Sequence, residues 1–160
     1  MVELNQAFLD QAKESYLGKA AEKVDNYFCS GLQDFVPAQG HYDVIWCQWV
    51  VGQLRDEHLV KFFTRCKDGI AENGLIVLKD NINDKNALGP DFDADDSSYC
   101  RTRDHLVSLI KQAGLTIIRE EKESRFPRQL YEVRSFACKW VILTKTTFGI
   151  IRRWRKHSIV

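Results

Sequence analysis

A short apolar run constrains the fold of this chain more than any other stretch. Residues 44–47 read VIWC and follow a polar turn that ends at Gly40. An uninterrupted apolar run of this length is typical of a strand covered on both faces, as in a parallel sheet. Gln48 and Trp49 come where such a strand ends, and open α/β sheets bind ligands beyond the carboxyl ends of their strands. The run therefore predicts either a ligand-binding strand end or a buried strand whose last residues only pack.

Strand and helix patterns alternate on both sides of this run. Asn5 is placed to cap a helix over about residues 6–17, and Asp56 suits the N-cap of a helix that reaches about residue 72. Asn73 and Gly74 form a helix-ending signal. Further strands are predicted at residues 2–4, 26–29, 75–78, 115–118 and 131–138, and another helix from residue 102 or 104 to residue 114. This alternation indicates an α/β fold with a largely parallel sheet.

Composition places the chain among globular proteins without a strong overall charge. Its 160 residues suit one domain, with 44% hydrophobic and 28% charged residues and a formal net charge of +1. The five cysteines form no CxxC pair, which favours a reducing compartment. Neither a signal peptide nor a membrane-spanning run is recognisable. We therefore expect a cytoplasmic and/or nuclear protein that does not act at membranes.

Four aspartates lie close together in residues 91–98, which read DFDADDSS. Calcium is one candidate partner, because the first aspartates mimic the start of an EF-hand loop. That loop needs glycine where Asp96 stands and glutamate where Thr102 stands, so the match is incomplete. A cationic substrate, either an amine or a lysine side chain, is the second candidate. A solvated loop without a partner is the third interpretation.

The last residues of the chain are basic. Residues 144–160 read TKTTFGIIRRWRKHSIV and carry aromatic side chains among the cations. Such a segment is typical of binding to nucleic acid, to an anionic membrane surface or to an import receptor, and also of a frayed terminus. We expect residues 1–140 to form the folded domain and residues 141–160 to be a basic C-terminal tail.

Five stretches together resemble the protein N-terminal methyltransferases, a family of class I S-adenosylmethionine-dependent enzymes. The matching strings are NYFCSGLQDF at 26–35, YDVIWCQWVVGQL at 42–54, GLIVLKDN at 74–81, DADDSSYCRT at 93–102 and QLYEVRSFA at 129–137. The resemblance covers about residues 1–138. It implies a Rossmann-like class I methyltransferase sheet, S-adenosylmethionine as methyl donor, and transfer of the methyl group to the α-amino group of proteins that begin X-Pro-Lys.

The resemblance also implies which residues bind the donor. These are Glu3, Leu4, Asn5, Leu32, Gln33 and Gln48. Glu3 would accept hydrogen bonds from the ribose hydroxyls, a role that suits a carboxylate at the end of a strand in dinucleotide folds. Leu32 and Gln33 would contact the adenine. Gln48 would close over the methionine part of the donor.

The residues implied for the peptide substrate follow in the same way. Asn81 and Asp96 would be the catalytic pair that holds the α-amino group. Trp49 would pack on the proline, and Asp93 and Ser98 would contact the lysine. Tyr131 would form a wall of the peptide channel. The chemistry agrees, because an amine attacks a sulfonium methyl only as a neutral nucleophile. A carboxylate can take its proton, and an amide can orient the nitrogen.

The sequence departs from the family pattern in three respects. It contains no GxGxxG-like turn, so we expect an N-terminally truncated sheet that lacks the first strand and leaves the neighbouring strands without that ladder partner. Gln53 stands where the family commonly has histidine, so proton removal would rest on Asp96 alone. The basic tail extends past the family's usual end. The alternative function is a non-catalytic binder of Pro-Lys protein N-termini; nucleic-acid binding through the tail is a third possibility, which the near-zero net charge disfavours.

Overall fold

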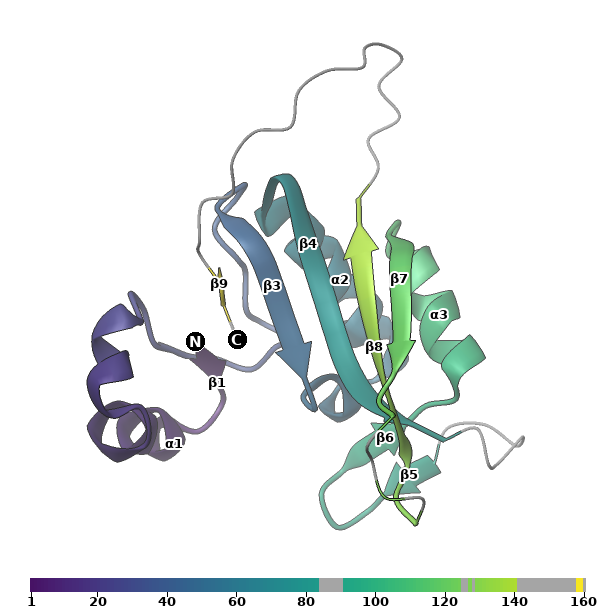
Figure 1. The fold of residues 1–160 in the computed structure, drawn as a ribbon, viewed down its shortest axis with the longest axis horizontal. Helices are drawn as coiled ribbons and strands as arrows, with labels where there is room; N and C mark the ends of the chain where they lie inside the picture. Colours follow the sequence, from purple (N-terminus) through teal and green to yellow (C-terminus); the bar gives the residue numbers. More distant parts are fainter. Residues whose placement is uncertain (84–90, 125–126, 128, 141–157, 160) are drawn as a thin grey trace.

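Strand β3 (Tyr42–Gln48) contains the apolar run of residues 44–47, as predicted. The computed structural model describes residues 1–83, 91–124, 127, 129–140 and 158–159. In it, β3 pairs in parallel with β4 (Ile70–Ile82), and helix α2 (Asp56–Gly69) makes the crossover between the two strands (Figure 1). This β3-α2-β4 unit forms the part of the sheet on which the site is built.

The main sheet is mixed. Its strand order is β7-β8-β4-β3-β9, with β7 at Thr116–Lys122, β8 at Glu132–Lys139 and β9 at Ser158–Ile159. β3 runs parallel to β4 and β9, whereas β8 runs antiparallel to β4 and β7. The expectation of a largely parallel sheet is wrong for the β7–β8 half. The connection between these strands is shorter than the dozen or more residues that a parallel crossover needs.

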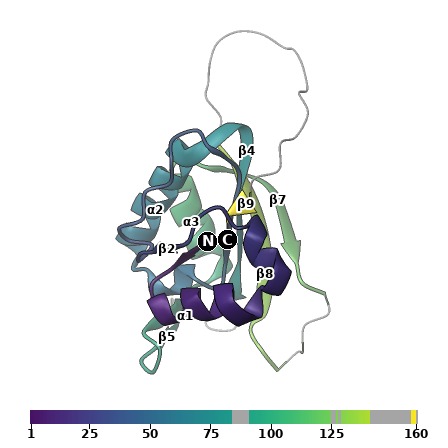
Figure 2. The same cartoon turned by 90° about the vertical axis from the view of Figure 1, so that its left-hand side faces the viewer.

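Helices α2 and α3 (Arg103–Gln112) cover the same face of the sheet (Figures 1 and 2). Their buried side chains recur every three to four residues, as a single apolar stripe requires. They are Leu59, Phe62, Phe63 and Cys66 on α2, and Leu106, Leu109 and Ile110 on α3. Thr102 caps α3, because its Oγ1 accepts a hydrogen bond from the backbone N–H of His105 at 3.3 Å.

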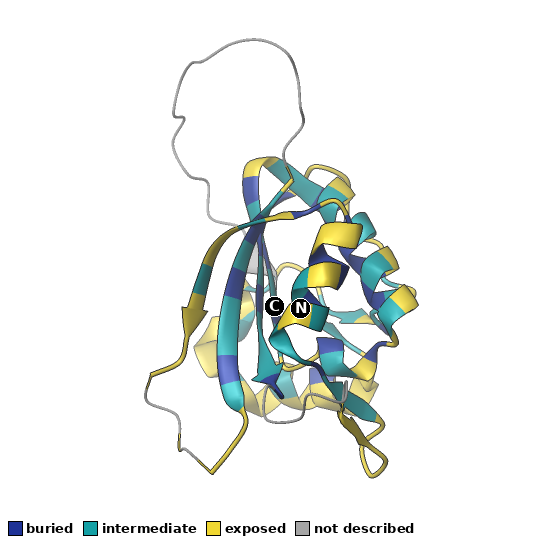
Figure 3. Ribbon diagram, turned by 90° about the vertical axis from the view of Figure 1, so that its right-hand side faces the viewer, coloured by how far each residue is buried: buried dark blue, intermediate teal, exposed yellow. Residues whose placement is uncertain are grey.

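Burial alternates along β3. Ile45 and Cys47 are buried in the hydrophobic core, whereas Val44 and Trp46 are only half-buried. Within the described residues, only the face of β3 that carries Ile45 and Cys47 belongs to the buried core, which includes Phe62 and Cys66 of α2, so the prediction that both faces are covered is wrong. At the far edge of the sheet, most positions of β7 are exposed (Figure 3).

The N-terminal segment forms a small sheet of its own. β1 (Val2–Glu3) pairs in parallel with β2 (Phe28–Cys29), and helix α1 (Gln6–Gln11) lies between them in sequence. Asn5 caps α1 as predicted, since its Oδ1 accepts a bond from the N–H of Ala7 at 3.0 Å. The helix predicted over residues 6–17 is shorter, because a π-helical turn (Ala12–Tyr16) and a 3-10 helix (Gly18–Lys23) follow it.

The edge of β3 that faces away from β4 carries a short partner. Ser158 pairs with Val44, and Ile159 pairs with Ile45, both in parallel register. The strands next to the missing first strand are expected to lose that ladder partner, and on this edge β3 has a partner over two residues. Residues 141–157, on which the expected division into a domain and a basic tail depends, lie outside the described part of the chain.

The connection from α2 into β4 differs from the prediction. α2 ends at Gly69, and the chain is already extended at Ile70. Asn73 and Gly74, predicted to end the helix, instead form an irregularity within β4, and Asn73 has a φ of 67°. A Cβ atom at Gly74 would lie 2.9 Å from the carbonyl oxygen of Asp43, so only glycine allows this close approach.

The acidic stretch forms a hairpin. β5 (Asp91–Asp93) pairs antiparallel with β6 (Ser98–Cys100), and Asp96 and Ser97 lie in the turn between them. Among the residues that the structure describes, no group of three or more His, Cys, Asp or Glu side chains is placed to hold a metal ion. No helix in this part of the chain is long and apolar enough to span a membrane. None of the five cysteines, all of which lie in the described part of the chain, forms a disulfide.

Candidate functional site

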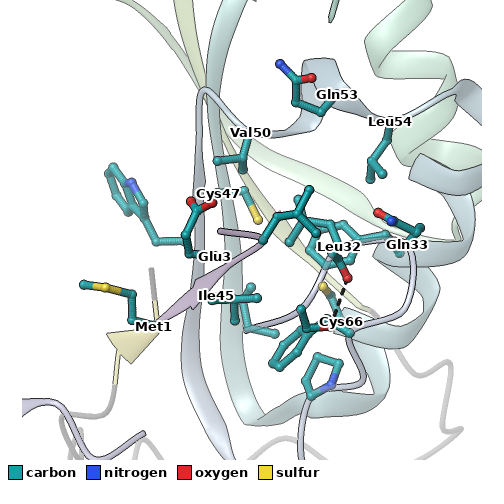
Figure 4. Close-up of a pocket in the computed structure, with 18 of the residues that line it drawn as sticks. Met1, Glu3, Leu32, Gln33, Ile45, Cys47, Val50, Gln53, Leu54 and Cys66 are labelled. Atoms are coloured by element: carbon teal, nitrogen blue, oxygen red, sulfur yellow. Dashed lines mark hydrogen bonds between the residues drawn. The ribbon is translucent and has the colours of Figure 1, made fainter. Parts of the chain in front are cut away.

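A cavity of about 650 Å³ opens between the N-terminal segment and β3. Its walls come from β1, from the loop after β2, from β3 and from the turn after β3. Figure 4 shows Glu3 and Gln33 on opposite sides of this hollow, with Ile45 and Cys47 of β3 among its walls. We call this cavity the first pocket. Its walls are largely apolar, with a carboxylate and amides at the margins.

Most of the residues predicted to bind the donor line the first pocket. They are Glu3, Leu4, Leu32, Gln33 and Gln48. Asn5 does not line it, because its side chain caps α1 instead. The Glu3 side chain is held by the backbone of Asn5, whose N–H donates to Glu3 Oε1 at 2.9 Å. Gln48 Oε1 accepts a bond from Trp46 Nε1 at 3.2 Å.

The loop that carries Leu32 and Gln33 is fastened to α2 by Arg65, a residue that the sequence reasoning missed. Arg65 Nη2 donates to the carbonyl oxygens of Leu32 at 2.7 Å and Gln33 at 2.9 Å, and its Nε donates to that of Phe35 at 2.9 Å. Three carbonyls of an irregular loop are satisfied by one guanidinium, which explains why this loop keeps a defined shape without regular structure.

A second cavity, of about 380 Å³, lies beyond the carboxyl ends of β3 and β4. Most of the residues predicted for the peptide substrate line it. These are Trp49, Asn81, Asp96, Ser98 and Tyr131. They come from four separate places in the sequence: the ends of β3 and β4, the β5–β6 hairpin, and the approach to β8. The structure therefore brings Trp49, Asn81 and Asp96 to one hollow, which we call the second pocket.

Trp49 has an unusual backbone at the end of β3. Its φ is 52°, in the left-handed region that large side chains rarely adopt, and its N–H donates to the carbonyl oxygen of Lys79 at 3.0 Å. Lys79 Nζ lies 5.8 Å from the indole centroid, within the range of a cation–π contact. The indole remains 48% exposed. Such strain at a cavity wall is typical of a residue held for contact with a ligand.

Asp93 is not a wall of the second pocket. It is exposed, and its Oδ1 accepts a bond from the N–H of Asp95 at 2.9 Å within the hairpin turn. Tyr131 does line the pocket and donates its hydroxyl to Asp91 Oδ2 at 2.7 Å. This bond raises the pKa of Tyr131 to about 12, so Tyr131 stays a neutral phenol that can donate but not act as a base near neutral pH.

Arg101, at the end of β6, fixes the turn that follows β3. Its side chain is 3% exposed. Nε donates to Asp56 Oδ1 at 2.8 Å, Nη1 donates to the carbonyl oxygen of Val51 at 3.2 Å, and Nη2 donates to that of Leu54. The turn is thereby held against the hairpin so closely that a Cβ at Gly52 would lie 3.2 Å from the carbonyl oxygen of Tyr99. This contact forms one wall of the second pocket.

Asp80 also lines the second pocket, next to Asn81. Its Oδ1 accepts a bond from the N–H of Asn81 at 2.8 Å, whereas its Oδ2 is buried and has no hydrogen-bond partner in the described structure. Burial raises the pKa of Asp80 to about 6, although the Asn81 N–H and the charge of Arg101 act in the opposite direction. The sequence reasoning missed this residue. The one available signal was its place directly before Asn81 at a strand end.

The two pockets share a wall. Trp49 and Gln53 line both of them. A molecule in the first pocket and another in the second would therefore meet across these two side chains. A group-transfer reaction between two bound substrates requires this arrangement, because binding both next to each other makes a bimolecular step effectively unimolecular.

The chain is similar in sequence to N-terminal Xaa-Pro-Lys N-methyltransferases. The N-terminal Xaa-Pro-Lys N-methyltransferase 1-B of Xenopus laevis is 48% identical over 139 residues, which are 87% of this chain and 60% of that protein. The N-terminal Xaa-Pro-Lys N-methyltransferase 1 of Homo sapiens is 46% identical, with the same 87% and 60% covered. The chain thus spans about three fifths of the length of the curated relatives it matches.

Solved structures share the fold. A SAM-dependent methyltransferase of Leishmania major aligns with a TM-score of 0.74 at 24% identity, over 86% of this chain and 53% of that one. An O-methyltransferase of Brevibacillus brevis, in complex with S-adenosyl-L-homocysteine, aligns with a TM-score of 0.69 at 15% identity, over 87% and 57%. These likenesses confirm the Rossmann-like methyltransferase fold. A sequence profile of the AdoMet-dependent proline di-methyltransferases matches residues 1–139, and the chain belongs to this family.

Proposed function

We propose that this chain binds S-adenosylmethionine in the first pocket and the N-terminus of an X-Pro-Lys protein in the second, and that it methylates the α-amino group. The observation that carries the proposal is the shared wall of Trp49 and Gln53 between the two pockets. The relatives named above are N-terminal Xaa-Pro-Lys N-methyltransferases, which is the same chemistry.

The first pocket suits the donor in size and in polarity. Its volume of about 650 Å³ and its apolar lining accommodate an adenosine, while Glu3 offers a carboxylate to the ribose hydroxyls. Leu32 would pack on the adenine, and the amides of Gln33 and Gln48 supply hydrogen bonds at either end. When bound, S-adenosylmethionine supplies a methyl group on a positively charged sulfur.

The second pocket suits a cationic, proline-containing chain end. The exposed part of the Trp49 indole offers a flat apolar surface to the proline ring. Asp96 brings a carboxylate to the α-ammonium group, and Asn81 can orient the nitrogen through its amide. Ser98 and Tyr131 line the same cavity. Asp93 is proposed to bind the third-position lysine from outside the cavity. It lies on the exposed β5–β6 hairpin, so it would contact only a peptide that extends from the pocket across this hairpin.

The partners and location of the chain are also part of the proposal. Its substrates would be proteins with an exposed X-Pro-Lys N-terminus. Its location would be the cytoplasm and nucleus, where the environment is reducing, as suits cysteines that form no disulfide. We propose no nucleic-acid or membrane partner, because the formal net charge is only +1.

The test is a methyl-transfer assay with the full chain. The chain is incubated with S-adenosylmethionine and a peptide that begins Ser-Pro-Lys, and the peptide mass is followed by mass spectrometry. We expect a gain of one or more methyl groups at the N-terminus, and none on the same peptide with an acetylated α-amino group. Peptide binding without mass gain would favour the non-catalytic binder, and neither binding nor mass gain would refute the proposal.

A further inference from the structure

Asp80 carries a buried carboxylate oxygen at the wall of the second pocket. Its Oδ2 has no hydrogen-bond partner in the described structure, whereas its Oδ1 accepts the N–H of Asn81 at 2.8 Å. A buried carboxylate oxygen without a donor is costly, and a catalytic role or a bound ligand, water or ion is among the explanations for one in a native structure. Because Asp80 lines the second pocket, a ligand bound there is the candidate donor for this oxygen.

Charged and titratable groups approach Asp80 from several elements. Arg101 faces it from the end of β6, and the Cys47 thiol faces it from β3. Asp96 of the hairpin and Tyr131 before β8 line the same cavity, and Tyr99 and Cys100 of β6 complete the set. Arg134 pairs with Asp80 in the ladder of β8, but its guanidinium bonds to Glu120 and Glu132.

Few of the other groups around the second pocket can accept a proton near neutral pH. The pKa of Tyr131 is raised to about 12 by its bond to Asp91, and burial raises the pKa of Cys47 to about 12. Both therefore keep their protons near neutral pH. Asp96 is exposed and accepts the N–H of Ser98 at 2.9 Å. Among the described residues that line the cavity, none is a histidine.

We propose that Asp80 is the proton acceptor for the α-ammonium group of the bound peptide. In this step one N–H bond of the ammonium breaks, its electron pair remains on nitrogen, and the proton forms an O–H bond with Asp80 Oδ2. A charged pair becomes a neutral amine and a neutral carboxylic acid. This assignment rests on the proposed function, since it takes the peptide N-terminus as the ligand of the second pocket.

The elevated pKa of Asp80 suits this role. An ordinary carboxyl group lies about four units below an α-amino group, so proton transfer between them is strongly uphill. Burial raises the pKa of Asp80 from 3.8 to about 6, which makes the transfer roughly 100-fold less unfavourable. The group is still ionised near neutral pH, as an acceptor must be.

A purely structural role makes the opposite prediction for stability. If Asp80 served mainly as a counter-ion for the buried Arg101, Asp80→Asn would lower the melting temperature at neutral pH. In the role proposed here, the folded chain holds the Asp80 proton to higher pH than the unfolded chain does. Ionisation therefore destabilises the fold as pH rises through about 6. Asp80→Asn would then raise the melting temperature at about pH 7.5 by a few degrees and leave it unchanged below about pH 4.

The second readout is peptide binding by calorimetry, with a Ser-Pro-Lys peptide that has either a free or an acetylated α-amino group. For the wild-type chain we expect about a tenfold preference for the free amine at about pH 7.5, which shrinks towards about pH 5 as Asp80 is protonated. Asp80→Asn should lose most of this preference and all of its change between these pH values. Asp96→Asn should keep the change in preference between these pH values. Asp25→Asn, on an exposed loop, should behave as wild type.

The outcomes separate the two proposals. If the wild-type chain shows no preference for the free amine, the proposed function fails, and the role of Asp80 fails with it. If the wild-type chain shows the preference and Asp80→Asn keeps both it and its pH dependence, only the role of Asp80 is overturned. A lowered melting temperature of Asp80→Asn at neutral pH would likewise assign Asp80 to the support of Arg101.

Discussion

Replacement of Arg101 by methionine tests how the second pocket is built. Arg101 is 3% exposed and joins the hairpin to the turn after β3 through bonds to Asp56, Val51 and Leu54. Methionine fills a similar volume but offers no donor. The carbonyl oxygens of Val51 and Leu54 would then be left without their donor in a buried place, and the hairpin would lose its attachment to the turn.

The magnitude follows from these bonds. Leaving a buried acceptor unpaired costs about 1–3 kcal/mol, and breaking a buried ion pair costs about 3–5 kcal/mol. Asp56 is 44% exposed, so water would hydrate its carboxylate after the ion pair is broken and reduce the energy lost. We therefore expect Arg101→Met to lower the free energy of unfolding by roughly 3–4 kcal/mol, a large part of the 5–15 kcal/mol that typical domains possess. Asp56→Asn, the matched control, should cost less than about 1 kcal/mol.

Urea unfolding followed by far-UV circular dichroism measures this difference. With a slope of about 2 kcal/mol per molar, Arg101→Met should move the midpoint down by roughly 2 M. Where the variant is still folded, its affinity for a Ser-Pro-Lys peptide should also fall, because Gly52 and Tyr99 would separate. A loss of stability below about 1 kcal/mol, with unchanged peptide affinity, would refute the view that Arg101 holds the pocket together.

Three further predictions concern other parts of the site and the sheet. Trp49→Ala should weaken peptide binding about tenfold, and Trp49→Phe should weaken it less, as titration calorimetry would show; equal affinities for all three chains would contradict the role of the indole. Glu3→Gln should weaken S-adenosylmethionine binding by about 10–100-fold with unchanged peptide binding, because a charge-assisted bond to the ribose is lost. The pKa of Glu120 is held below its ordinary 4.5, chiefly by its bond to Arg103 and also by Arg134. The ionised Glu120 therefore stabilises the fold fully above about pH 4.5, and this stabilisation is lost as pH falls through the lower pKa of the folded state. The stability advantage of wild type over Glu120→Gln should therefore vanish in acid, and a constant difference down to about pH 2 would count against this network.

The central part of the fold was predictable because its signals are local. The apolar run at residues 44–47 marked β3, and helical spacing marked the stripes of α2 and α3. Asn5 and the polar pair Gln48-Trp49 were placed by the rules for helix caps and strand ends. The substrate residues from distant stretches were placed through the resemblance, and the structure brings most of them to one cavity.

What failed depended on contacts between distant residues. Asn73-Gly74 reads as the end of a helix, yet the close approach of Asp43 makes it part of β4. The burial of Arg101 and the unpartnered oxygen of Asp80 arise only when the hairpin folds against the turn after β3. Neither has a periodicity or a spacing from which it could be inferred.

The most direct test of the whole account is a crystal structure of the chain with S-adenosyl-L-homocysteine and a Ser-Pro-Lys peptide bound together. The account predicts the nucleoside in the first pocket beside Glu3, and the peptide nitrogen in the second pocket within reach of Asp80 and Asp96. The sulfur should lie across the Trp49–Gln53 wall, about 4–5 Å from that nitrogen, the distance left when the transferred methyl is absent. A peptide bound elsewhere, or with its nitrogen directed away from these carboxylates, would contradict it.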